Sequence, residues 1–455
     1  MKVKIMKTVD IVERIEGEAK LNLTWNEKKV SDASIDFLNF RGFEYILENK
    51  PILDALVYTP RICGICGQAH LLATVNAIEN LYKNSGNELQ ITNKAKILRE
   101  LGLIIEIIDS HIKWFYMFIM PDVIAISKKQ YEGYTPLKGE KWLGAQKGAS
   151  EIIKALAIYA GQWPHTSYML PGGVVSDPTL LDIVTCENYI DQTIKYFEKD
   201  IAGISIENYL SLNSFEELTL LSSSLRDFVD ISFETKLEQV GKAHNRHLVL
   251  SDMIDVKPGL YNKKISNNID LAKIKESEEY TFNINKKDSK KAHTWSKSVQ
   301  YNKHFYEVGP LSRAVINERE FITTLHNKYD DSTFTRVMSR VDEIAHLLIY
   351  SKKLIKQIDI SEESYIKPKV DLKSLENITA TSTVEACRGS LVHTLSVNKG
   401  LITKYDVITP TVWNLGPKNN IELGVAQNAI IGSKSLNEAK IILRSFDVCS
   451  VCTTH

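Results

Sequence analysis

Apolar residues recur at helical spacing over several long stretches of the chain. From Thr92 to about Met120, isoleucine, leucine and phenylalanine lie three or four positions apart, which predicts one amphipathic helix with Thr92 as its N-cap. We expect Pro121 to end this helix, because proline has no N–H to donate. Comparable patterns predict further helices over about 66–83, 147–161, 179–200 and 332–358. Their length and apolar faces predict a core built as a helical bundle.

Two shorter stretches alternate between apolar and polar residues, as half-buried strands do. Residues of about 18–38 predict two strands around a short polar turn, within an N-terminal hairpin of about 10–40. Residues 390–412 predict a second hairpin around an Asn-Lys-Gly turn.

The order of these patterns predicts the fold class. Helical patterns dominate between about 60 and 380, so we predict an α+β fold that is predominantly α, with small peripheral β-sheets around a large helical bundle. The polar, lysine-rich stretch of about 262–300 is expected to be a solvated insert, because the charges around it are mixed. The C-terminal segment of about 385–455 carries the second hairpin and the last cysteines.

Charge and composition exclude several classes of partner. The 455 residues carry 56 Lys+Arg and 56 Asp+Glu, so no net positive field is available to hold nucleic acid. No run of 18 or more apolar residues is present, and we predict no membrane span. The N-terminus lacks the apolar core of a secretion signal. We therefore expect a cytoplasmic protein, with membrane association or export only through a signal-bearing partner.

Four of the six cysteines form two Cys-x-x-Cys pairs, Cys63 with Cys66 and Cys449 with Cys452, one near each end of the chain. Two thiols three residues apart can reach the same metal ion. A joint site would hold the N-terminal and C-terminal segments together, which is typical of a buried centre around which a fold is built. Spacing alone leaves a redox dithiol, a structural zinc site, and nickel or iron open.

Longer motifs surround both pairs. The first lies in Arg-x-Cys-Gly-x-Cys-x-x-x-His and the second in Asp-x-Cys-x-x-Cys-x-x-His at the C-terminus. Further motifs are Arg-Ile-Glu-Gly at 14–17, Arg-Gly-Phe-Glu at 41–44, Pro-Gly-Gly-Val at 171–174, Glu-Val-Gly-Pro-Leu at 307–311, Glu-Ala-Cys-Arg-Gly at 385–389 and Pro-Thr-Val-Trp-Asn at 410–414. In this order they resemble the large, catalytic subunit of nickel–iron hydrogenases. The resemblance implies a single unit over 1–455 that catalyses H₂ ⇌ 2H⁺ + 2e⁻.

The resemblance also implies roles for the cysteines. Cys63 and Cys449 would be terminal ligands of nickel, while Cys66 and Cys452 would bridge nickel to an iron that carries CO and cyanide. Soft thiolates suit both metals. Cys449 would take the proton released from H₂, and Glu16 would pass it outward. Without the resemblance, Glu16 would be interpreted as a surface carboxylate on a strand.

Two groups of residues would act around the metal pair. Arg388 resembles an arginine that lies over the open side of the metal pair, and Thr411 resembles a residue that donates to one cyanide. Without the resemblance, Arg388 would be interpreted as a salt-bridge partner and Thr411 as a turn residue. Glu44, the backbone carbonyl of Val407, and His455 resemble ligands of Mg²⁺ or another divalent ion.

Four other residues receive lesser roles. His70 is expected to hydrogen-bond a cysteine sulfur, and His111 to lie just outside the ligands or in the core. Cys387 stands where the family has proline, which places a thiol near the gas-facing side of the iron. Cys186 is expected to be a core residue.

The chain has no further cysteine set for an electron wire, so the resemblance implies a small subunit with iron–sulfur clusters. It also implies maturation factors. Most family members lose an extension after the final histidine to a C-terminal endopeptidase, so a sequence that stops at His455 is either the mature form or one without an encoded extension, as in hydrogen-sensing members. Two alternatives stay open. One is a regulatory hydrogen sensor with the same centre. The other is a non-catalytic scaffold, either zinc-binding or similar to a related subunit of complex I that lacks the four cysteines.

Overall fold

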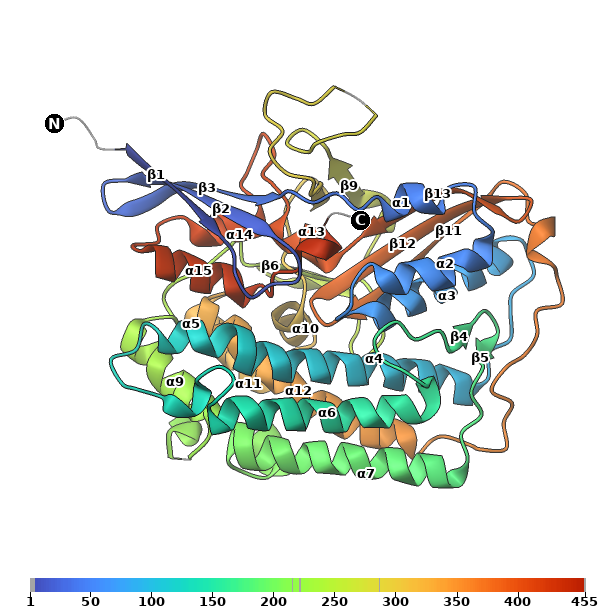
Figure 1. The fold of residues 1–455 in the computed structure, drawn as a ribbon, viewed down its shortest axis with the longest axis horizontal. Coiled ribbons are helices and arrows are strands. Elements are labelled where there is room, and N and C mark those ends of the chain that lie inside the picture. Colours follow the sequence, from blue (N-terminus) through green and yellow to red (C-terminus); the bar gives the residue numbers. More distant parts are fainter. Residues whose placement is uncertain (1–4, 215, 221, 286, 454–455) are drawn as a thin grey trace.

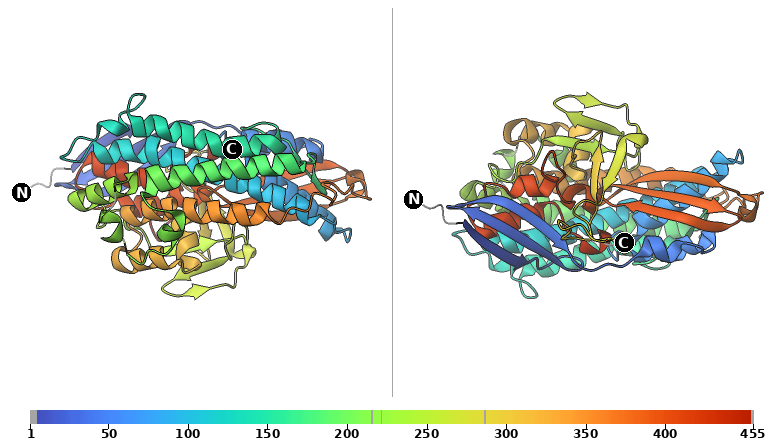
Figure 2. Two further views of the ribbon diagram at one scale, coloured as in Figure 1. Left: turned by 90° about the horizontal axis from the view of Figure 1, so that it is seen from below. Right: turned by 90° about the horizontal axis from the view of Figure 1, so that it is seen from above.

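The computed structural model describes residues 5–453 except 215, 221 and 286. Long helices form the lower layer of Figure 1: α4 (Asn93–Lys113), α6 (Glu140–Ala160), α7 (Leu180–Tyr196) and α12 (Thr333–Ile355), with α3 (Gly67–Asn84) above α4. α4, α6, α7 and α12 pack side by side, as the view from below in Figure 2 shows. The predicted helical bundle is therefore confirmed.

Hydroxyl side chains cap several long helices, and one of these caps, Thr92, is the one that the sequence predicts. Thr92 accepts a hydrogen bond from the backbone N–H of Ala95, and Ser332 accepts one from Thr335. These caps satisfy N–H groups that have no acceptor inside the helix. The shorter helices connect and cover this bundle; they are α1 (Phe43–Leu47), α2 (Ala55–Tyr58), α5 (Met120–Ile124), α8 (Ile206–Leu210), α9 (Ser224–Thr235), α10 (Pro310–Ile316), α11 (Glu320–Tyr329), α13 (Pro410–Leu415), α14 (Val425–Ile430) and α15 (Leu436–Ser445).

The prediction that Pro121 ends the helix after Met120 is wrong. α4 widens into a π-helix over Trp114–Ile119, and α5 follows it directly. Pro121 lies in the first turn of α5, a position at which helices tolerate proline. A second π-helix, Phe197–Ala202, extends α7 in the same way.

The small sheets lie above the helices. β1 (Ile5–Ile11), β2 (Ala19–Asn26) and β3 (Lys29–Phe37) form an antiparallel sheet, so the two predicted strands are present and β1 adds a third. β11 (Ile378–Ala386), β12 (Gly389–Asn398) and β13 (Leu401–Ile408) form another, in which β12 and β13 are the predicted hairpin. Viewed from above, these two sheets lie toward opposite ends of the molecule (Figure 2).

The remaining strands are short: β4 (Met169–Leu170), β5 (Gly173–Val174), β6 (Arg246–Val249), β7 (Gly259–Asn262), β8 (Ile265–Ser266), β9 (Ile274–Ser277) and β10 (Ser298–Tyr301). The segment of about 262–300, expected to be solvated, is so only in part. Its end is buried, because the N–H of Trp295 donates to the carbonyl of Phe37 at 2.8 Å and the N–H of Phe37 donates to Thr294 Oγ1 at 3.0 Å. Hydrogen bonds with the end of β3 satisfy backbone groups of this segment that its polar sequence predicts to be solvated.

Candidate metal centre

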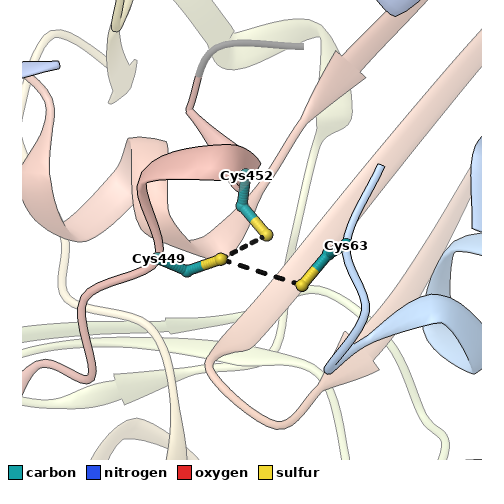
Figure 3. Close-up of side chains that lie close together, drawn as sticks. All are labelled: Cys63, Cys449 and Cys452. Atoms are coloured by element: carbon teal, nitrogen blue, oxygen red, sulfur yellow. Dashed lines mark hydrogen bonds between the residues drawn. The ribbon is translucent and has the colours of Figure 1, made fainter. Parts of the chain in front are cut away.

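The two cysteine pairs meet between the bundle and the sheets. Sγ of Cys63 lies 3.7 Å from Sγ of Cys449, Cys66 lies 3.6 Å from Cys452, and Cys449 lies 3.0 Å from Cys452. Figure 3 shows three of these side chains pointing toward one another from the two segments. All four are at most 5% exposed, and all are free thiols. The structure therefore brings together the cysteines of the predicted joint site from both ends of the chain.

Local backbone structure fixes each pair. α3 begins directly after Cys66, and a 3-10 helix over Ser450–Cys452 carries the second pair. The carbonyl of Glu16 accepts from the N–H of Ser450 at 2.8 Å, so the N-terminal segment is held beside that turn.

The charge of the cluster explains why it suits metal ions. Hydrogen bonds from Cys449, Cys452 and Cys66 hold the pKa of Cys63 well below its usual range. Burial raises the pKa of Cys449, and the nearby Cys63 raises it further. One thiolate thus suppresses the ionisation of its neighbours unless a cation balances the charge. Four buried soft sulfur donors fit nickel and iron.

Arg388 reaches the cysteines from the tip of a hairpin. Ala386 pairs with Gly389, so Cys387 and Arg388 form the two-residue turn between β11 and β12. Arg388 Nε donates to the carbonyl of Asp447 at 2.9 Å, and Nη2 donates to Asp447 Oδ1 at 3.2 Å. Although burial lowers it, the pKa of Arg388 ends above its usual value because of Asp447 and the nearby cysteines. Arg388 therefore stays charged beside the thiols.

Asp447 joins this arginine to a second one, which the sequence did not predict. Arg340 Nη1 lies 3.0 Å from Asp447 Oδ2, and both side chains are nearly buried. Arg340 also stacks over the ring of Trp114 at 4.5 Å. The position of Asp447 two residues before Cys449 was visible in the sequence. Its partner Arg340 comes from helix α12, and periodicity does not distinguish a buried arginine from a solvated one.

His111 lies in a neighbouring ion-pair network. Its Nε2 is 2.9 Å from Glu343 Oε2, and Glu343 is also bound by Arg313 through bonds of 2.8 and 2.6 Å. Arg313 Nη1 reaches Glu385 at 3.0 Å. Burial lowers the pKa of His111 to about 4. His111 therefore acts as a neutral core residue that orients this network.

The remaining polar candidates lie around the cysteines. Glu16 is half-buried, and burial together with the nearby Cys63 raises its pKa. Thr411 is 2% exposed, and its hydroxyl has no hydrogen-bond partner among the residues that the structure describes. Cys387 is 1% exposed, and burial raises its pKa to about 11. Cys186 packs in the core, as expected.

A small cavity of about 40 Å³ lies where the divalent ion was predicted, lined by Glu44 and Val407 among others. Glu44 Oε1 accepts from the N–H of Val407 at 2.8 Å. Lys297 Nζ lies 3.5 Å from Glu44 Oε2 and 3.5 Å from Glu276 Oε1. His455 lies outside the described residues. Lys297 was not predicted here, because it belongs to the segment that the sequence assigned to solvent.

Comparison with known proteins agrees with this geometry. A family described as nickel-dependent hydrogenase matches residues 41–133 and 137–455. The chain belongs to this family. It is 25% identical to the periplasmic NiFeSe hydrogenase large subunit of Desulfomicrobium baculatum, over 99% of this chain and 95% of that protein. It is 22% identical to the hydrogenase-2 large chain of Escherichia coli, over 98% of this chain and 96% of that protein.

The fold of this hydrogenase chain also matches a solved structure. The NiFeSe hydrogenase from D. vulgaris Hildenborough in the reduced state superimposes with a TM-score of 0.82, at 22% identity, over 99% of this chain and 100% of that one. The predicted α+β, mostly helical class and the resemblance to a catalytic large subunit that cleaves H₂ are confirmed. The family match favours this enzyme over the sensor and the scaffold. Within the described residues, no helix is long and apolar enough to cross a membrane.

Proposed function

We propose that Cys63, Cys66, Cys449 and Cys452 hold a nickel–iron pair, with Cys66 and Cys452 bridging the two metals. The observation that carries this proposal is the meeting of four buried thiols from opposite ends of the chain, joined in a row by Sγ–Sγ distances of 3.7, 3.0 and 3.6 Å. The metal pair, with CO and cyanide on iron, supplies the binding and heterolytic cleavage of H₂. The surrounding side chains handle the proton and the charge.

The proton leaves through two groups of this chain. Cys449 Sγ, which contacts both Cys63 and Cys452 and is proposed to bind nickel alone, accepts it first. The carboxyl of Glu16 then takes it outward; a pKa raised by burial brings a carboxyl closer to the working pH of a proton carrier. Arg388, held by Asp447, keeps a positive charge over the thiolates. Thr411 offers its buried hydroxyl to one cyanide.

A divalent ion, Mg²⁺ or another, is proposed in the small cavity, bound by Glu44, the carbonyl of Val407 and His455. Water would complete its shell, because a hard ion of this kind retains several waters. Lys297 and Glu276 then face the ion's water shell with opposite charges. The cavity volume of about 40 Å³ exceeds what one water needs.

The electrons pass to a small subunit with iron–sulfur clusters, since this chain offers no further group of cysteines for such clusters. Maturation factors would insert the metals, and a C-terminal endopeptidase would act if the gene encodes an extension. We propose a cytoplasmic location, or membrane association or export through a signal-bearing small subunit. H₂ is the substrate.

The decisive experiment compares Glu16→Gln with Glu18→Gln in the complex of both subunits. Glu18 is an exposed carboxylate two residues away and serves as the matched control. We expect Glu16→Gln to slow H₂-driven dye reduction by about 10²–10⁴-fold, with nickel content and the infrared bands of CO and cyanide unchanged. Glu18→Gln should retain the activity.

Two results would contradict the proposal. Equal activity in the Glu16→Gln variant and the wild type would remove the proton role of Glu16. Metal analysis that finds zinc alone, together with an infrared spectrum lacking CO and cyanide bands, would overturn the proposed centre.

A further inference from the structure

A buried chain of hydrogen bonds lies behind His70, on the side away from the cysteines. His70 Nδ1 is 3.0 Å from His393 Nε2. His393 Nδ1 is 2.8 Å from the hydroxyl of Tyr405, which is 2.9 Å from Thr74 Oγ1. These side chains come from α3, β12 and β13, and none is more than 2% exposed. The chain therefore connects the first helix of the metal centre to the C-terminal sheet.

His70 also faces the sulfurs. One of its ring nitrogens lies within 4.8 Å of Sγ of both Cys66 and Cys452. Because Nδ1 is bonded to His393, Nε2 is the nitrogen left for the sulfur side. A neutral imidazole carries one N–H, so the bond to His393 decides whether His70 donates to the sulfurs or presents a lone pair to them.

The far end of the chain cannot release a proton. Thr74 Oγ1 donates to the carbonyl of His70 at 2.9 Å and contacts Thr59 Oγ1 at 2.7 Å. Thr59 donates in turn to the carbonyl of Ala55 at 2.8 Å. Backbone carbonyls accept hydrogen bonds but do not carry protons onward. The chain therefore orders hydrogen bonds and is not an exit path like the one proposed through Glu16.

Two arrangements of the protons satisfy these distances. In the first, Thr74 turns its O–H from the carbonyl of His70 to Tyr405, Tyr405 donates to His393 Nδ1, His393 donates from Nε2 to His70 Nδ1, and His70 keeps its N–H on Nε2. In the second every bond is reversed, and His70 turns a lone pair toward the sulfurs. Thiolates that bind metal are acceptors, so they favour the first arrangement.

We propose that His393 and Tyr405 are positioning residues that fix the N–H of His70 on the nitrogen facing Cys66 and Cys452. This inference rests on the proposed metal centre. A hydrogen bond to a bridging sulfur withdraws electron density from it, and the metals then donate less density to CO. The buried chain thus tunes the electronic state of the pair through residues that touch neither metal.

The test uses the holoenzyme and two substitutions of His393. His393→Met fills a similar volume without a donor, whereas His393→Gln places an amide N–H near the former Nε2. We expect the CO stretching band of His393→Met to move to lower wavenumber, and its nickel midpoint potential to become more negative, with nickel content unchanged. His393→Gln should keep both values near those of the wild type.

A band and a potential identical in His393→Met and wild type would overturn the inference. If His393→Met fails to load nickel, the Tyr405→Phe variant is measured in its place. Its CO band must move in the same direction but by a smaller amount, because Thr74 Oγ1, 3.3 Å from His393 Nδ1, can still donate to that nitrogen. An unmoved band in Tyr405→Phe then overturns the inference. A wild-type spectrum without CO bands would instead overturn the proposed centre, and the inference with it.

Discussion

Asp447 is a counter-charge shared by two buried arginines, so its neutralisation should destabilise the fold. Its carboxylate lies 3.0 Å from Arg340 and 3.1 Å from Arg388, and all three side chains are at most 6% exposed. Asp447→Asn keeps the shape and one acceptor oxygen but removes the charge. The two guanidinium groups would then repel each other without compensation.

The magnitude follows from the burial of these groups. Two unit charges about 4 Å apart attract by about 4 kcal/mol at an effective dielectric of 20. Breaking a buried ion pair by removing one partner costs about 3–5 kcal/mol in measured cases. With a denaturant slope of about 3 kcal/mol per M, the urea midpoint of unfolding should fall by about 1–2 M.

The assay is urea unfolding of the metal-free chain, followed by far-ultraviolet circular dichroism. The matched control is Asp191→Asn, since Asp191 pairs with Lys352 at 2.5 Å but is 39% exposed. An exposed pair contributes about 0–1 kcal/mol, so the control midpoint should stay near that of the wild type. If both variants unfold at the same urea concentration, Asp447 is not the counter-charge that this reasoning requires.

Three further predictions concern single side chains. Burial lowers the pKa of His247 to about 4, whereas it is about 6.5 in the unfolded chain. As pH falls from 6.5 to 4, the wild type should therefore lose up to about 3 kcal/mol of unfolding free energy relative to His247→Gln. Urea midpoints that fall equally with pH in the two proteins would disprove this. Thr411→Val should leave metal-free stability unchanged or higher, because it removes an unpartnered hydroxyl, yet should shift a cyanide band of the loaded enzyme. Cys387→Pro fits the first turn position between β11 and β12 and should change the rate of oxygen inactivation; identical inactivation kinetics would refute a role for this thiol.

The sequence predicted the features that repeat regularly or concentrate unusual residues. Helical spacing located the bundle, because a buried stripe on a helix imposes that spacing on the chain. The paired cysteines indicated the candidate centre, because two Cys-x-x-Cys pairs in one chain are typical of a metal site. Pro121 was misjudged because a π-helix precedes it, and periodicity does not distinguish such a widened turn from a helix end.

Contacts between distant segments were beyond the local pattern. Lys297 was assigned to solvent, although it lies 3.5 Å from Glu44 at the predicted ion site. Asp447 and Arg340 carry charges that usually face water, and only their mutual distance in the fold shows that they are buried partners. A charged residue looks the same in a sequence whether its partner is water or another buried charge.

The meeting of the cysteine pairs has a consequence for how the chain is tied together. Cys63 and Cys449 lie 386 positions apart in sequence, so metals bound by both act as a cross-link that closes a loop of almost the whole chain. In the chain-entropy treatment of disulfides, a loop of this size corresponds to roughly 6 kcal/mol of lost freedom in the unfolded state. Metals bound at the proposed centre would then stabilise the fold as well as catalyse the reaction. Removing them with a chelator would lower the free energy of unfolding even though the other contacts of the molecule are unchanged.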